Sequence, residues 1–61
     1  MAATERFEEY IGGLTPRERE AVQGVLARYR AELLAARSEE ARVRIVDEFV
    51  KDIRDRLIPQ Q

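Results

Sequence analysis

The amino-acid sequence contains neither cysteine nor histidine among its 61 residues. Without cysteine the chain cannot form a disulfide bond, and without both residue types it lacks the usual ligands of structural zinc. A catalytic pair of the Ser/His or Cys/His kind is excluded for the same reason. We therefore expect a protein that is not an enzyme and that uses no cofactor or metal.

Long apolar runs are also absent from the sequence. A membrane-spanning helix needs about 18 or more apolar residues in succession, and no segment comes near that length. The opening residues, MAATERFEEY, carry acids where a signal peptide would need an apolar stretch. These features predict a cytoplasmic protein that makes no membrane contact.

The chain is short and highly charged. A domain of about 60 residues buries only about 60% of the surface that its unfolded chain exposes, so its core is marginal unless something reinforces it. Small helical chains without disulfides or metals often gain stability by self-association. Charged residues make up 38% of the sequence, yet the net charge is only −1. Because the chain is short, we expect a homodimer. Because its net charge is close to zero, we do not expect nucleic acid to be its main partner.

The first predicted helix covers residues 4–12. Thr4 can cap its start, and Gly12 and Gly13 would end it in the left-handed conformation that glycine tolerates. Residues 1–3 would then be frayed. The apolar side chains recur at i, i+3, i+4 and i+7 and predict one buried face: Phe7, Tyr10, Ile11 and Leu14. A helix of about ten residues does not persist alone in water, so it must dock on the rest of the chain.

The second predicted helix covers residues 16–37 and has the clearest start signal. Thr15 and Glu18 form a capping box, and Pro16 occupies the first helical position, where its missing N–H is not needed. The large apolar residues fall within an arc of about 100° and would pack lengthwise on another helix: Val22, Val25, Leu26, Tyr29 and Leu33.

Two residues of this second helix do not fit its pattern. Leu34 lies off the apolar arc, so it would contact the first helix or a partner. Gly24 costs about 1 kcal/mol relative to alanine in a helix interior. It marks either a surface position under little constraint or a place where another backbone approaches closely.

The third predicted helix covers residues 39–58, and Pro59 stops it before a tail at residues 59–61. The opposite side of this helix pairs acids with bases, for example Asp47 with Lys51. Its apolar residues span an arc of about 160°, which is wider than one neighbouring helix can bury: Val43, Ile45, Val46, Phe49, Val50, Ile53 and Leu57. The third helix therefore needs a second partner besides the second helix.

The joint at residues 37–40 decides how these helices are arranged. Ser38 can cap a new helix, with acids directly after it. If the second helix simply continued, its apolar seam would place Glu40 and Asp47 at core positions. This mismatch favours an antiparallel hairpin, with one long straight or kinked helix as the alternative.

The expected fold is all-α, with a short N-terminal helix folded over a long antiparallel helical hairpin. A second copy would cover the surplus apolar face of the third helix, giving a four-helix-bundle-like homodimer. The residues expected at this protein interface are Tyr29, Leu33, Val46, Phe49, Val50, Ile53 and Leu57. In the alternative, a monomeric three-helix bundle, Phe7, Tyr10 and Ile11 would cover much of that face.

The segment Leu14–Glu20, LTPRERE, resembles the opening of LuxR-type DNA-binding domains and, more loosely, of sigma-factor region 4. The resemblance implies a short turn and a polar recognition helix after this opening. Here residues 21–37 are instead predicted to continue as one helix. The resemblance therefore ends before the part that carries the family's function, and it assigns no functional residue.

The function that fits these features best is a small non-enzymatic interaction module, a regulator or adaptor that docks an apolar helix face on a protein partner. The alternative is a nucleic-acid-binding regulator. Arg19, Arg30 and Arg37 would line up within about 20° along one flank of the second helix, and a dimer would double that stripe. Against this alternative, acids stand at the start of the third helix, where a helix-turn-helix protein would meet DNA.

Overall fold

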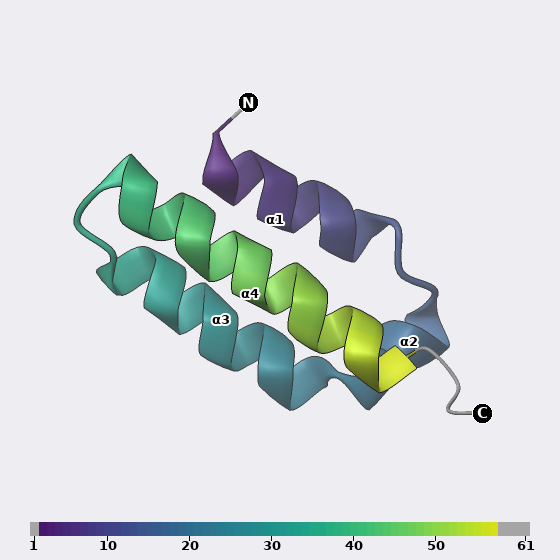
Figure 1. Cartoon of the computed structure of the whole chain (residues 1–61). Coiled ribbons are helices and arrows are strands. Elements are labelled where there is room, and N and C mark those ends of the chain that lie inside the picture. The colour runs from purple at the N-terminus through teal and green to yellow at the C-terminus, as the bar shows by residue number, and fades with distance from the viewer. Residues whose placement is uncertain (1, 58–61) are drawn as a thin grey trace.

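The computed structural model describes residues 2–57, and all of the regular structure in that range is helical. The helices follow one another as α1 (Ala3–Gly12), α2 (Pro16–Ala21), α3 (Gln23–Ala35) and α4 (Glu39–Leu57). α4 packs against both α1 and α3, and α2 crosses the end of the bundle near the last turns of α4 (Figure 1). The predicted all-α class is confirmed. Ile58 and the tail at residues 59–61 lie outside the described residues, as does Met1.

α1 begins earlier than its sequence predicts. Ala3 is its first residue and is 1% exposed, so the expectation of fraying through this position was wrong. The Thr4 side chain does not cap the helix. Instead, the backbone N–H of Ala3 donates to the Glu39 carboxylate, 2.7 Å away at the start of α4. The start of α1 is therefore stabilised by a residue that is distant in the sequence.

The end of α1 also differs from the prediction. Gly13 follows the helix with φ −85° and ψ −8°, which is a right-handed conformation. Its N–H donates to the carbonyl oxygens of Glu9 and Tyr10. The left-handed glycine cap predicted here was therefore wrong, and a tightened last turn satisfies these carbonyl groups instead.

The single helix predicted for residues 16–37 is broken at Val22. The capping box of Thr15 and Glu18 is present and starts α2 as predicted. Val22 then leaves helical geometry at φ −114° and ψ 16°, and a new helix begins at Gln23. α2 itself has no buried residue. The break lets α2 cross the end of the bundle while Val22, 3% exposed, enters the core.

α3 and α4 form the predicted antiparallel hairpin, and the single long helix is excluded. Ala36 is extended, with φ −67° and ψ 140°. The Ser38 hydroxyl accepts a hydrogen bond of 3.1 Å from the backbone N–H of Ala41, which caps α4 as expected. Arg42 holds the connection by donating to the Ala36 carbonyl at 3.2 Å and to Glu39 at 3.1 Å.

Phe49 of α4 lies at the centre of the core. Its ring centroid is 4.6 Å from that of Phe7, 5.4 Å from that of Tyr29 and 5.5 Å from that of Tyr10. Tilted and edge-on contacts at these distances are the favourable arrangements of aromatic rings. α1 thus supplies the second partner that α4 needs, which is the arrangement of the three-helix alternative. The buried residues are Ala3, Phe7, Ile11, Val22, Tyr29, Leu33, Val46, Phe49 and Ile53.

Candidate interaction surface

Most of the residues that the sequence predicts at a protein interface lie inside the chain's own core. Tyr29 and Leu33 are 5% and 6% exposed, and Val46, Phe49 and Ile53 are 0% exposed. Val50 and Leu57 are partly buried and pack against the same core. The face of the third helix that the sequence left for a second copy is in contact with α1 in this chain, because the rings of Phe7 and Tyr10 pack against Phe49. An interaction surface in this conformation has to be sought elsewhere.

A group of polar side chains joins α3 to α4 at the edge of the core. The Tyr29 hydroxyl donates to Asp52 at 3.0 Å, and Arg56 donates to the other carboxylate oxygen of Asp52 at 2.6 Å. Burial, followed by the hydrogen bond to Asp52, raises the pKa of Tyr29. The hydrogen bond from Arg56 lowers the pKa of Asp52, and the bond from Tyr29 lowers it further. These groups therefore stabilise the helix pair with Tyr29 neutral and Asp52 ionised.

Ion pairs join α1 to both of its neighbours. Arg30 of α3 donates to both carboxylate oxygens of Glu8, and its guanidinium group lies 5.2 Å from the centre of the Phe7 ring. Arg6 of α1 pairs with Asp47 of α4 at 2.8 Å. Asp47 thus pairs across helices with Arg6 instead of forming the predicted pair with Lys51. These side chains serve the packing of α1.

The three arginines predicted to line one helix flank do not form a stripe. Arg19 belongs to α2, beyond the break at Val22, and donates to the Leu14 carbonyl at 3.1 Å. Arg30 is paired with Glu8, and Arg37 follows the end of α3 at Ala35. The predicted alignment was wrong because it assumed one continuous helix.

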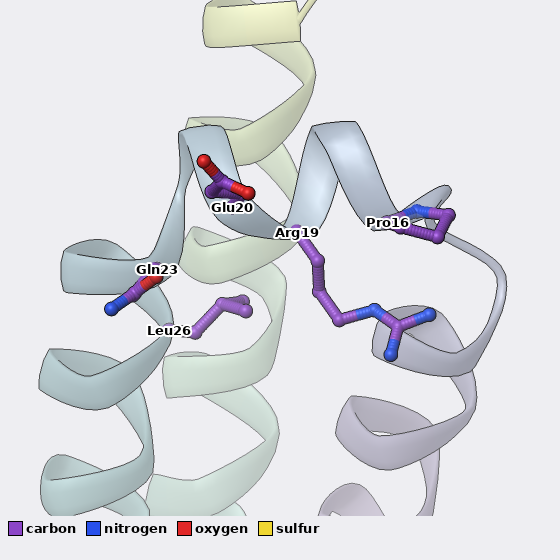
Figure 2. Close-up of a pocket in the computed structure, with 5 residues that line it drawn as sticks. All are labelled: Pro16, Arg19, Glu20, Gln23 and Leu26. Atoms are coloured by element: carbon purple, nitrogen blue, oxygen red, sulfur yellow. The ribbon is translucent and has the colours of Figure 1, made fainter.

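A hollow lies where α2 crosses the bundle (Figure 2). Arg19 extends below α2 towards α1, whereas Glu20 lies above Gln23 and Leu26 of α3. The polar side chains that line the hollow provide one guanidinium group, one carboxylate and one amide, and no activated nucleophile is among them.

The outer side of α3 carries the most exposed large apolar side chain of the described residues. Leu34 is 84% exposed, whereas Leu33 beside it is 6% exposed. A recess of about 180 Å³ adjoins Leu34 on the side of α1, with Phe7 and Arg30 among its lining residues. We define the outer face of α3 by the exposed small and apolar residues of that side: Gly24, Ala27, Ala31, Leu34 and Ala35.

Two further properties of residues 2–57 bear on function. No group of three or more His, Cys, Asp or Glu side chains in this range could hold a metal ion. None of the helices described there combines the length and apolar character that crossing a membrane requires.

Residues 2–57 form a small helical bundle, and the outer face of α3 carries exposed apolar side chains. No family model matches the sequence, and no curated protein and no solved structure matches it either. The functional argument therefore rests on the residues of this chain. Among these residues, the sequence alone had marked Leu34 as a possible contact, because Leu34 lies off the apolar arc of the predicted second helix.

Proposed function

We propose that this chain is a small non-enzymatic interaction module that binds a protein through the outer face of α3. The observation that carries the proposal is the exposure of Leu34, 84% on a regular helix. Full burial of a leucine side chain contributes about 1.5–3 kcal/mol, so a partner that covers Leu34 gains this contribution. Ala27 and Ala31 extend the apolar surface along the same side of the helix.

Three of the charged side chains support this proposal, because their contacts hold the helices together. Arg30, Asp52 and Glu39 each bind a group on another helix, as described above. The sequence has no histidine or cysteine that could act as a base or nucleophile beside them. A binding role needs no such group. Our proposal accordingly places the module in the cytoplasm as a regulator or adaptor.

Site-specific photo-crosslinking in cells of the native host tests the proposal. A photoreactive residue at position Ala31 should give a discrete adduct with a protein, because this position lies in the middle of the outer face of α3. The same residue at Lys51, which is exposed on α4, is the matched control and should give no such adduct. Adducts that are equal at the two positions would contradict the proposal.

The role of Leu34 is tested in the same experiment. Adding Leu34→Asp to the Ala31 photoreactive variant places a charge where a partner would bury an apolar side chain. The adduct should be lost, while far-UV circular dichroism of the purified variant stays helical because Leu34 is exposed. An adduct that persists would show that the outer face of α3 is not the binding surface.

A further inference from the structure

We draw no further inference here: the strongest candidate, the outer face of α3 with the recess of about 180 Å³ that adjoins Leu34, belongs to the surface already described, and nothing in the structure shows what covers it.

Discussion

α3 and α4 both carry apolar residues on more than one side, but the chain covers those of α4 more completely than those of α3. α4 has α1 on one flank and α3 on the other, and its residues Val46, Phe49 and Ile53 are 0% exposed. α3 contacts α4 on one side and leaves Leu34 84% exposed on the other. A small domain has too few elements to cover every helix. The outer helix of such a bundle is therefore where a binding surface is expected.

The largest expected effect lies on the covered helix. Phe49→Ala removes the ring that contacts Phe7, Tyr10 and Tyr29. Truncating a buried phenylalanine costs about 3–5 kcal/mol, whereas a domain of this size has a free energy of unfolding of about 3–9 kcal/mol. Urea unfolding followed by circular dichroism should show a strongly lowered midpoint. An unchanged midpoint would mean that α1 does not pack on α4 as described.

The neighbouring leucines of α3 give the most direct comparison of its two sides. Leu33→Ala should lower the free energy of unfolding by about 2–5 kcal/mol, because Leu33 is 6% exposed. Leu34→Ala should change it by about 0.5 kcal/mol or less, because Leu34 is 84% exposed. Urea unfolding is measured at low protein concentration, so that self-association does not contribute to the free energy of unfolding. Equal losses for the two variants would contradict the assignment of inner and outer sides.

The cap of α4 should have a smaller effect. Ser38→Ala removes the acceptor for the N–H of Ala41 and should cost about 1 kcal/mol. Ser38→Asp keeps an acceptor at the same position and should retain most of the stability. Thermal unfolding of both variants beside the natural chain checks this prediction. A loss in the aspartate variant as large as in the alanine variant would show that the side-chain cap is not the cause.

Acid should weaken the contacts of α4 with both of its neighbours. Hydrogen bonds from Ala3 and then Arg42 lower the pKa of Glu39, and the bond from Arg56 is the largest cause that lowers the pKa of Asp52. A folded-state pKa below the unfolded value gives stability that is present above the unfolded value. That stability is lost as the pH falls through the folded-state pKa.

Urea midpoints measured from neutral pH down into the acid range test this dependence. The ordinary pKa values of these groups are 4.5 for Glu39 and 3.8 for Asp52, so the loss should begin near the first value and continue below it. Glu39→Gln should flatten part of the curve, because Glu39 accepts the hydrogen bond from Ala3, whereas Glu40→Gln at the next position should not. An identical acid response in the two variants would contradict the role of Glu39 at the start of α1.

The smallest expected effect concerns the arginines. If the outer face of α3 acts through apolar contacts, replacing Arg19 and Arg37 together by alanine should leave retention on heparin almost unchanged. Arg30 is left in place because it holds Glu8. The salt concentration at elution measures the effect. A marked fall in that concentration would support the nucleic-acid-binding alternative, since binding to a polyanion depends on the number of cations in contact.

Local signals in the sequence predicted several features correctly. The capping box at Thr15 and Glu18 and the cap at Ser38 are present because each joins groups only three residues apart. The change of apolar phase near Glu40 predicted the hairpin. The periodic apolar residues also marked much of the core, including Phe7, Tyr29 and Phe49, but the sequence assigned several of them to an interface between copies.

What the sequence by itself determined is the all-helical class, the starts of the helices that follow Thr15 and Ser38, and most of the residues that must leave water, because capping and periodicity depend on near neighbours in the chain. Only the tertiary structure decided which helix covers which face. The contact of Ala3 with Glu39, the pairing of Arg30 with Glu8 and the break at Val22 depend on groups brought together from distant positions or on packing. The same packing decided that Leu33 is buried while Leu34 remains exposed. A candidate site on the outer face of α3 could be located only after α1 had been placed on α4.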